Sequence, residues 1–553
     1  MAGVEKRTPW IRLIRLLKLD KKDILHIFYY AIFDGLVALS LPLGVQAIIN
    51  LIQGAQVTSS WFLLVILVTL GVGFQGVLQI MQKRILENMQ QKIFIRSSFE
   101  FVYRFPKISI EELRNYYPPE LANRFFDTLT IQKSLSKILI DFPAAVLQIV
   151  FGLLLLSFYH SFFIFFGVLL IVLIVVVFKY TARRGLETSL KESKAKYKVA
   201  HWIQEIARSL LSFKIAEYSE LAMQKNDTYT QEYLDAREAH FKILMQQFMK
   251  LVGFKILVTA SLLIIGGLLV LNQQMNIGQF VAAEIIILLV INSVTKVIMG
   301  LESYYDVLTS IEKIGHVVDM KLDFKATGSL PFRKENQSLV LELDELTYAC
   351  FGKNIVDSLT LKITQGDRIL IKGSTGAGRS TLLKLISGVL VPTSGTLYVN
   401  ETPMSSLNLS EYHNHIGMMF PGQSPFEGTI LNNITLGEQI PEEQVYWALK
   451  STGLLSYIKR QPYGLQTMIQ SEGLHIPYTI SNRILLARAI VKKPKILLLK
   501  DPVDLFEPDE ARQIIKFLCD KKHPWALVSA SRSSLWDTYC NKTLTLHQGK
   551  LVD

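Results

Sequence analysis

Cysteine is scarce in this sequence. Three cysteines occur among 553 residues, at Cys350, Cys519 and Cys540, and all lie in the C-terminal half. They form no CxxC pair, so neither a disulfide framework nor a zinc site is favoured, and buried thiols in a reducing cytosol are expected. The first 23 residues are basic and lack an apolar core ahead of a small-residue cleavage site, so no cleavable signal peptide is predicted.

Acidic residues are fewer than basic ones, which leaves a formal net charge of +12. Such an excess can indicate nucleic-acid binding, but no recognition fold accompanies it, so nucleic acid is not an expected partner. The Lys and Arg residues instead collect beside apolar stretches, as cytoplasmic flanks of membrane spans do. Half of the residues are apolar. The composition therefore predicts a membrane protein, and the length suits two or three domains.

Six apolar stretches are long enough to cross about 30 Å of hydrocarbon as helices. They are Ile24–Ile49, Trp61–Met81, Ile138–Phe158, Ser161–Phe178, Leu251–Leu271 and Ile277–Met299. The short connections Gly54–Ser60, Tyr159–Ser161 and Asn272–Asn276 lack Lys and Arg, whereas the N-terminal leader and two long connections contain many. The positive-inside rule therefore places both termini and both long connections in the cytoplasm, with membrane lipid around the spans.

The two long connections, roughly Gln82–Lys137 and Lys179–Lys250, are mixed in charge and contain few glycines. They predict helical arms that continue the spans into the cytoplasm. Trp10–Leu19 alternates basic and apolar residues at helical spacing. This pattern predicts either a helix on the inner leaflet or simply a basic flank.

Asp34 and Glu284 are the ionisable residues deepest in the predicted spans. A carboxylate in hydrocarbon is costly, so each is expected to face the bundle interior or a water-filled path. A substrate or partner contact and a hydrogen bond between helices are equally open readings. Asp141 lies near a span end before Pro143, where a helix break or solvent access explains it without function.

The chain turns polar after the sixth span. We divide it into a basic segment at 1–23, a membrane domain at 24–320, a linker at 321–338 and a C-terminal domain at 339–553. From Leu339, short β-rich runs alternate with helical ones. This order predicts a cytoplasmic α/β domain with a largely parallel sheet.

A phosphate-binding loop is the most specific motif in the C-terminal domain. The predicted strand Arg368–Lys372 leads into Gly373, Ser374, Thr375, Gly376, Ala377, Gly378, Arg379, Ser380 and Thr381, which has the spacing G-x-x-x-x-G-K-[ST] of the Walker A motif. Its glycines let backbone N–H groups surround phosphate oxygens at a helix N-terminus. Arg379 replaces the usual lysine, and its planar fork cannot act as a compact point charge. Whether ATP and Mg²⁺ still bind is therefore left open.

With these features the whole chain resembles a type I ABC exporter half-transporter: six membrane helices, then an α/β P-loop nucleotide-binding domain. It is most similar to the bacterial type I secretion and bacteriocin-exporter branch, without that branch's N-terminal peptidase-like domain. The resemblance implies a homodimer or heterodimer in the bacterial inner membrane, with membrane-fusion or outer-membrane secretion components as further partners. It also implies that the arm tips, near Arg114–Leu121 and Leu210–Glu217, act as coupling helices on the P-loop domains.

The other family motifs, carried onto this sequence, are mostly substituted. The aromatic residue that stacks on adenine falls at Cys350, with Tyr348 and Phe351 nearby. The Q-loop glutamine falls at Pro421, although Gln423 is close. The remaining substituted positions are Ile476, Pro477, Tyr478, Thr479 and Ile480 at the LSGGQ signature, Lys500 and Asp501 at the Walker B pair, and Ala530 or Ser531 at the switch histidine.

Two of these changes conflict directly with hydrolysis. Lys500 reverses the charge beside the expected Mg²⁺, and Asp501 is one methylene shorter than the catalytic glutamate. Tyr478 and Thr479 replace two glycines whose backbone approaches the γ-phosphate across the dimer. The resemblance implies two composite ATP sites per dimer, each joining one subunit's Walker residues to the other's signature. This chain departs in both halves, so even an ordinary partner leaves no intact site.

We therefore expect a membrane transport or secretion subunit with a pseudo-ATPase domain. Two alternatives stay open. One is an ATP-driven exporter that uses Asp501 as the base. The other is a membrane scaffold for secretion or envelope proteins that transports nothing.

Overall fold

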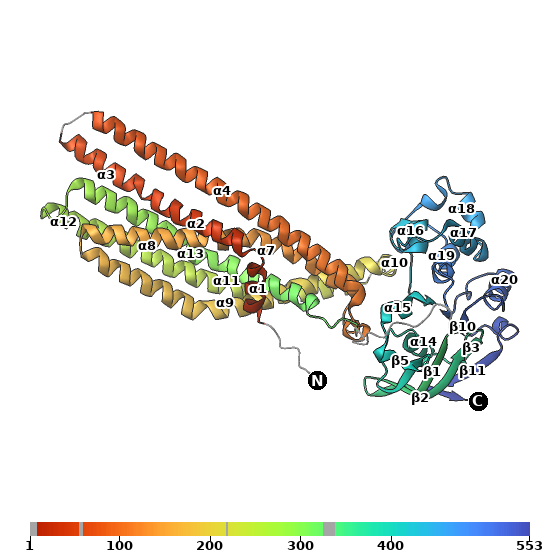
Figure 1. Cartoon of the computed structure of the whole chain (residues 1–553). Helices are drawn as coiled ribbons and strands as arrows, with labels where there is room; N and C mark the ends of the chain where they lie inside the picture. Colours follow the sequence, from red (N-terminus) through yellow and green to blue (C-terminus); the bar gives the residue numbers. More distant parts are fainter. Residues whose placement is uncertain (1–7, 55–58, 217–218, 324–337, 553) are drawn as a thin grey trace. The chain divides into compact units, whose positions relative to one another are not determined.

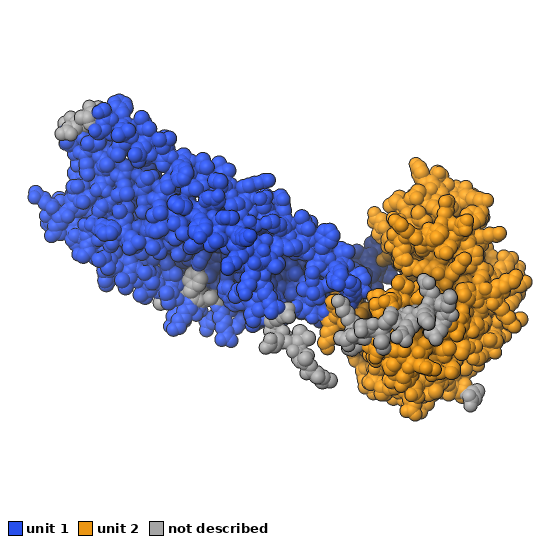
Figure 2. Space-filling view, in the orientation of Figure 1, with its two compact units in different colours: residues 1–107, 115–320 blue, residues 108–114, 321–553 orange. Residues whose placement is uncertain are grey.

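The structure is a computed structural model that describes residues 8–54, 59–216, 219–323 and 338–552. It divides into two compact units (Figures 1 and 2). The helical unit contains residues 1–107 and 115–320, and the P-loop unit contains residues 108–114 and 321–553. Most of the predicted linker lies outside the described residues, as do the start of the basic segment, residues 55–58 of the first short loop and Glu217.

The helical unit consists of long α-helices (Figure 1). Their bounds are α1 Pro9–Lys18, α2 Lys21–Ala38, α3 Ser40–Gln53, α4 Ser59–Arg104, α6 Pro118–Asn123, α7 Asp127–Ser136, α8 Phe142–Tyr159, α9 Phe162–Arg208, α10 Leu210–Ile215, α11 Leu221–Ser261, α12 Gly267–Leu271 and α13 Ile277–Val318. Helices α4, α9 and α11 contain 46, 47 and 41 residues. At 1.5 Å per residue they reach about 60–70 Å, well beyond a bilayer core, so the predicted helical arms are confirmed.

Within the described residues, five helical stretches are long and apolar enough to cross a membrane. They are Lys21–Gln53, Ser59–Lys107, Pro118–Tyr159, Leu221–Leu271 and Ile277–Val318. Each contains one of the predicted spans. The remaining predicted span, Ser161–Phe178, falls in α9, where the described residues give the shorter apolar segment Phe162–Val172.

A break divides the first predicted span. Helix α2 ends at Ala38 and α3 begins at Ser40, so Ile24–Ile49 forms two helices rather than one. Pro42 has no N–H to donate to the carbonyl of Ala38, which ends the hydrogen-bond ladder of α2.

A π-helical turn at Lys137–Asp141 precedes α8, whose second residue is Pro143. Asp141 is exposed at the end of this turn, as expected for a helix irregularity with solvent access. A second π-helical turn, Leu262–Gly266, connects α11 to α12. Both turns interrupt apolar segments that the sequence pattern alone reads as regular helices.

Helix α1 is held on α13 by charge and by packing. Arg12 donates to Asp319 at 2.7 Å and also pairs with Glu312. Leu13 is buried, and the Trp10 ring lies 5.0 Å from that of Tyr304. The predicted helix at Trp10–Leu19 is therefore confirmed over Pro9–Lys18, while its place on the inner leaflet stays a prediction.

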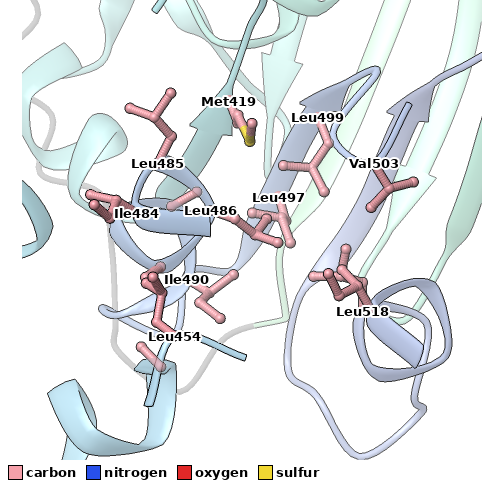
Figure 3. Close-up of a cluster of buried hydrophobic side chains, with 14 of the residues drawn as sticks. Met419, Leu454, Ile484, Leu485, Leu486, Ile490, Leu497, Leu499, Val503 and Leu518 are labelled. Carbon is pink, nitrogen blue, oxygen red and sulfur yellow. The ribbon is translucent and has the colours of Figure 1, made fainter. Parts of the chain in front are cut away.

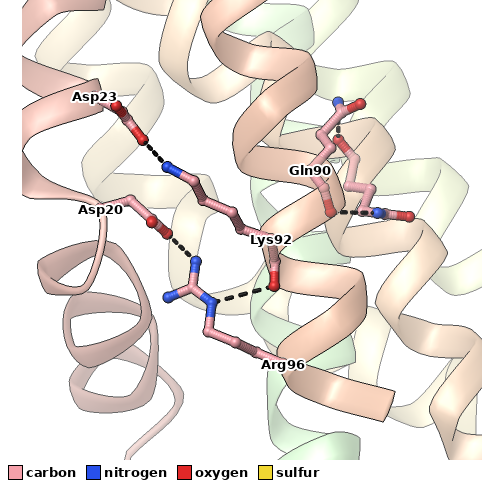
Figure 4. A network of polar contacts seen from close by, with 6 residues as sticks. Asp20, Asp23, Gln90, Lys92 and Arg96 are labelled. Atoms are coloured by element: carbon pink, nitrogen blue, oxygen red, sulfur yellow. Dashed lines mark hydrogen bonds and ion pairs between the residues drawn. The ribbon is translucent and has the colours of Figure 1, made fainter. Parts of the chain in front are cut away.

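Polar contacts also fasten the start of α2 to α4 (Figure 4). Lys92 donates to Asp23 at 2.7 Å, and Arg96 pairs with Asp20, whose side chain is almost fully buried. Gln90 donates to a backbone carbonyl of α7 at 2.8 Å. A buried carboxylate needs such a partner. These polar pairs therefore help to set the position of α4 relative to α2 and α7.

Within its described residues the P-loop unit contains three sheets. The largest has the order β12-β11-β3-β10-β9-β6 and is parallel except for β12, a second is antiparallel with the order β2-β1-β4-β5, and β7 pairs with β8. The strands are β1 Val340–Cys350, β2 Lys353–Thr364, β3 Arg368–Gly373, β4 Ser394–Val399, β5 Thr402–Pro403, β6 Ile416–Met419, β7 Gly428–Thr429, β8 Met468–Ile469, β9 Ile496–Lys500, β10 Ala526–Ala530, β11 Lys542–His547 and β12 Lys550–Val552. The predicted α/β fold with a largely parallel sheet is confirmed.

The P-loop unit also contains α-helices. They are α14 Arg379–Ile386, α15 Leu409–Asn414, α16 Ile430–Thr435, α17 Glu442–Ser451, α18 Leu455–Lys459, α19 Tyr478–Ile490 and α20 Pro508–Leu518. Leu497 and Leu499 of β9 join one buried cluster, with Leu485 and Leu518, whereas Leu498 joins another (Figure 3). Because β9 is buried on both faces up to Leu499, its first four residues are a continuous apolar run.

The short helix α5, Ile110–Leu113, belongs to the P-loop unit. Ser109 N–H donates to the carbonyl of Lys321 at 2.9 Å, and Ile110 packs against the cluster that contains β1. The P-loop unit therefore includes 108–114. Helix α6 begins within the predicted first arm tip, Arg114–Leu121, whose role as a coupling helix stays a prediction. Helix α10, Leu210–Ile215, occupies the second predicted tip.

Candidate functional site

The candidate site is a cavity of about 470 Å³ where three neighbouring parallel strands end. Strands β3, β10 and β9 lie side by side in register, with Ala530 opposite both Ile371 and Lys500. Loops that follow the carboxyl ends of such strands meet at one edge of the sheet. The lining residues come from these loops and from β2: Ile355, Ser374, Thr375, Gly376, Ala377, Gly378, Arg379, Ser380, Thr381, Lys500, Asp501, Asp504 and Arg532.

The predicted phosphate-binding loop has the backbone that its glycines allow. Gly378 is the N-cap of α14 and has a φ of +98°, in the left-handed region. A Cβ atom at Gly378 would lie 2.3 Å from the carbonyl oxygen of Ile355, whereas one at Gly376, φ +83°, would meet nothing within 4 Å. The loop therefore needs glycine at 378 for both conformation and space.

We expect Gly378→Ala to destabilise the protein by about 2–4 kcal/mol. Left-handed backbone costs alanine about 1 kcal/mol, and the clash with Ile355 adds about 1–3 kcal/mol. Gly376→Ala is the matched control, since it carries the backbone cost without the clash. Thermal unfolding of the full-length protein should show the larger decrease for Gly378→Ala, and equal decreases would contradict the tight packing of the loop.

Arg379 begins α14 beneath this loop. The residue is 6% exposed, and within the described residues its Nη1 atom is buried with no hydrogen-bond partner. A buried guanidinium nitrogen without a partner is costly, because the lost contacts with water are not replaced. An anion in the loop would supply the missing acceptor.

Lys500 lies at the end of β9, across the cavity from the loop. Its Nζ donates to Ser380 Oγ at 2.5 Å. In a P-loop this hydroxyl is the one that ligates Mg²⁺. Within the described residues no group of three or more His, Cys, Asp or Glu side chains could hold a metal ion. Mg²⁺ does not fit this site, because the Lys500 ammonium is hydrogen-bonded to the Ser380 hydroxyl that would ligate the metal.

Asp501 follows Lys500 in a left-handed conformation, with a φ of +49°. Its N–H donates to the carbonyl of Ala530 at 3.0 Å, and its Oδ1 is buried without a partner among the described residues. Burial and the neighbouring Asp504 carboxylate raise the pKa of Asp501. Asp501 thus lines the cavity, as the base position predicted from the sequence requires, but its strained backbone does not extend the strand.

The structure adds a third cation that sequence reasoning did not single out. Arg532 Nη2 donates to Thr375 Oγ1 in the phosphate-binding loop. Ala530 and Ser531, the predicted switch positions, are fully buried and do not line the cavity. Ser531 Oγ instead donates to Asp504 at 3.3 Å. The signal available was the place of Arg532 directly after the switch position Ser531.

The three residues at the adenine position do not form an open stacking surface. Tyr348 is buried in the core cluster. Arg114 covers this region, with its guanidinium 5.3 Å from the Tyr348 ring centre and Nη1 3.1 Å from Cys350 Sγ. Phe351 is 86% exposed in a left-handed turn. None of the three lines the cavity, and Tyr348 cannot stack on a base without leaving the core.

The Q-loop and signature residues also lie outside the cavity lining. Gln423 Oε1 accepts a hydrogen bond from the Phe420 N–H at 3.1 Å, which turns the amide back onto its own loop, and Pro421 is exposed. At the signature, Pro477 is the N-cap of α19, and Tyr478, its first residue, is 60% exposed. Ile476 and Ile480 pack against the core, and Thr479 is half-buried.

The two intramembrane acids differ in their surroundings. Asp34 of α2 is buried and accepts a hydrogen bond from Gln79 of α4 at 3.1 Å. This contact is the hydrogen bond between helices that one of the two sequence readings expects. Glu284 is half-buried in α13.

Two family matches place these features in context. Residues 24–294 match the ABC transporter transmembrane region, and residues 356–504 match the ABC transporter domain. The chain therefore belongs to the ABC transporter family. Its order of one membrane domain and one nucleotide-binding domain is that of an exporter half-transporter. The family's P-loop domain implies ATP, typically with Mg²⁺.

Known proteins similar to this chain include exporters and flippases. An ATP-dependent lipid A-core flippase of Desulfotalea psychrophila is 22% identical over 563 residues, covering 97% of this chain and 96% of the relative. A flippase of the same description from Burkholderia orbicola is 25% identical, covering 51% and 47%. A mesentericin transport/processing ATP-binding protein of Leuconostoc mesenteroides is 25% identical, covering 52% and 40%. The chain thus aligns with about half or less of the length of the Burkholderia and Leuconostoc proteins.

Among solved structures, a bacterial Atm1-family ABC exporter with ATP bound is similar in fold. The TM-score is 0.81 at 16% sequence identity, and the match covers 96% of this chain and 94% of the other. At this identity the likeness concerns the fold alone. The predicted fold class, a helical membrane domain followed by an ABC nucleotide-binding domain, is confirmed.

Proposed function

We propose that this chain is an ABC-exporter-type transport or secretion subunit whose nucleotide-binding domain does not hydrolyse ATP. The observation that carries the proposal is the Lys500 ammonium on Ser380 Oγ. Hydrolysis in P-loop NTPases needs Mg²⁺ at this hydroxyl and a carboxylate beside it. Lys500 supplies a cation where the carboxylate is needed, and a buried like charge repels the metal.

The signature region supports the same conclusion. In this family the second half of each ATP site comes from a partner's signature, and Tyr478 and Thr479 stand where glycine backbone is needed. The exposed Tyr478 ring at the start of α19 leaves no room for a close phosphate approach. We therefore propose a homodimer or a heterodimer that lacks an intact composite site, with membrane-fusion or outer-membrane secretion proteins as further partners.

Location and cargo follow from the same resemblance. The absence of Lys and Arg from the predicted short loops favours a bacterial inner-membrane protein with the P-loop domain in the cytoplasm. Two of the similar proteins are lipid A-core flippases. Their names favour an amphiphilic, lipid-like molecule as the class of substrate.

ATP hydrolysis by the purified chain in lipid vesicles tests the proposal. We expect phosphate release with Mg²⁺ to equal that of the Arg379→Ala variant, because neither protein has a working metal site. Turnover at rates common for enzymes, about 1–1,000 per second, that disappears in Arg379→Ala would overturn the proposal.

A second candidate is an ATP-driven exporter that uses Asp501 as the base. It is favoured by one observation, since Asp501 lines the cavity with an unpartnered carboxylate oxygen. Transport into the same vesicles separates the candidates. This second candidate requires substrate transport that Asp501→Asn abolishes, whereas the pseudo-ATPase shows the same result with and without the substitution.

A further inference from the structure

The cavity carries more positive than negative side-chain charge. Arg379, Lys500 and Arg532 line it, against the two carboxylates Asp501 and Asp504. The loop adds backbone N–H groups at the start of α14. A site of this composition attracts an anion with several negative charges rather than a neutral molecule or a cation.

One unpartnered atom and one contact favour the arrangement of this charge around a ligand. Arg379 is only 6% exposed, and its Nη1 atom is buried without a hydrogen-bond partner among the described residues. Arg532 reaches across from the end of β10 to Thr375 in the loop. Arg379 and Arg532 thus both lie at the loop that surrounds phosphate groups in a P-loop.

We propose that this cavity binds the polyphosphate chain of a nucleoside di- or triphosphate without Mg²⁺, with the Lys500 ammonium in the place of the metal ion. The inference rests on the proposed function, in which the domain is a P-loop site that has lost hydrolysis. Lys500 already holds the hydroxyl that Mg²⁺ would ligate. A Mg²⁺ ion sits about 2.0–2.1 Å from each oxygen ligand, so it would lie against the ammonium and be repelled.

A fixed ammonium can perform part of the metal's task. Mg²⁺ in P-loops neutralises the phosphate oxygens and orients them, and a lysine hydrogen-bonded to Ser380 offers further N–H donors to the same space. It cannot ligate and activate a water as a metal does. The same substitution therefore allows binding and opposes hydrolysis, which suits a domain that responds to nucleotide without consuming it.

Calorimetric titration of the full-length protein in lipid nanodiscs tests this inference. ATP and inorganic tripolyphosphate are each titrated in excess EDTA and in excess Mg²⁺. We expect at least one of them to bind in EDTA, with an affinity equal to or greater than that in Mg²⁺. Similar affinities for both would assign recognition to the phosphate chain, and tighter ATP binding would assign it to a nucleotide. Either result supports metal-free binding.

Variants at Lys500 sharpen the test. Lys500→Asp should weaken binding in EDTA at least tenfold and make it depend on Mg²⁺, because it restores the carboxylate. Lys500→Met should weaken binding equally in EDTA and in Mg²⁺. Arg512→Ala, an exposed residue on α20 outside the cavity, is the matched control and should change nothing. Thermal unfolding of each variant confirms that it is folded.

The inference is overturned if the unsubstituted protein binds neither compound or binds only with Mg²⁺. Failure of the proposed function looks different, because it requires ATP turnover. Binding that depends on Mg²⁺ without turnover would remove only the metal-free site. Binding that depends on Mg²⁺ with turnover would remove both.

Discussion

Replacing Arg368 with alanine is expected to destabilise the P-loop unit by about 3–5 kcal/mol, enough to unfold a marginally stable domain. Arg368 on β3 is 3% exposed, and its guanidinium donates only to backbone carbonyls. These carbonyls belong to Asp367, Cys519, Asp520, His523 and Trp525, at distances from 2.5 to 3.4 Å. Without the guanidinium, several buried acceptors lose their donor at once.

The position of these carbonyls strengthens the effect. Cys519 is the C-cap of α20, where the helix dipole presents partial negative charge, so a buried cation is favourable there. Burial lowers the pKa of Arg368, but a guanidinium stays charged at neutral pH. Lysine is a poor substitute, since a single ammonium cannot reach acceptors spread around a planar fork.

Thermal unfolding of the full-length protein, followed by tryptophan fluorescence, measures this prediction. The indole of Trp525 is fully buried next to the site, and its Nε1 donates to the carbonyl of Leu518 at 2.9 Å. Arg512→Ala on α20 is the control. The ion pair of Arg512 with Asp509 is at the surface and should contribute about 0.5 kcal/mol or less to stability. Equal losses in the two variants would show that the carbonyls find other donors.

Much of the fold can be predicted because it depends on local patterns. Apolar segments of span length, such as Trp61–Met81, identify helices because only a helix satisfies its own backbone in lipid. The uninterrupted apolar run of β9 identifies a strand covered on both faces. The phosphate-binding loop is predictable for a similar reason, since the left-handed Gly378 against the Ile355 carbonyl is a requirement of backbone geometry.

Other features depend on contacts between distant residues and could not be predicted. The first span is broken at Leu39, a break that Pro42 allows but does not require. The packing of Ile110 against the cluster that contains β1 cannot be read from the sequence of the arm itself.

The candidate site shows the same division. Lys500 could be recognised as a charge reversal from the sequence, but its hydrogen bond to Ser380 joins residues 120 positions apart. Arg532 was missed for this reason, since its partner Thr375 is 157 positions away. Tyr348, one of the two aromatic residues near the adenine position at Cys350, is buried in a core cluster, and its sequence neighbours do not reveal this packing.

Restoring the Walker B pair alone is expected to leave ATP hydrolysis at the level of the unsubstituted chain. The variant combines Lys500→Asp with Asp501→Glu, which returns a carboxylate to the metal and a longer one to the attacking water. Each site of the proposed dimer still lacks the partner's signature, because Tyr478 and Thr479 are unchanged. Residues that act as a unit in catalysis give almost nothing when only some of them are present.

Repair of the signature in addition should raise the rate by about 100-fold or more. The second variant adds Tyr478→Gly and Thr479→Gly, so that backbone amides at the start of α19 can reach the transferred phosphoryl group. Donors of this kind are each worth about 10²–10³ in rate. Phosphate release with Mg²⁺ in lipid vesicles measures both variants, and the two glycine substitutions alone are the matched control.

The three results together separate the origins of the inactivity. If the Walker B variant alone hydrolyses ATP rapidly, then the signature substitutions do not block the second half of the site. If the glycine substitutions alone are sufficient, then Lys500 tolerates Mg²⁺ beside it, and the metal-free site is wrong. We propose that the Lys500 charge and the Tyr478 side chain each oppose ATP hydrolysis independently. This proposal requires that the rate of hydrolysis rises only when the Walker B pair and the signature are both restored.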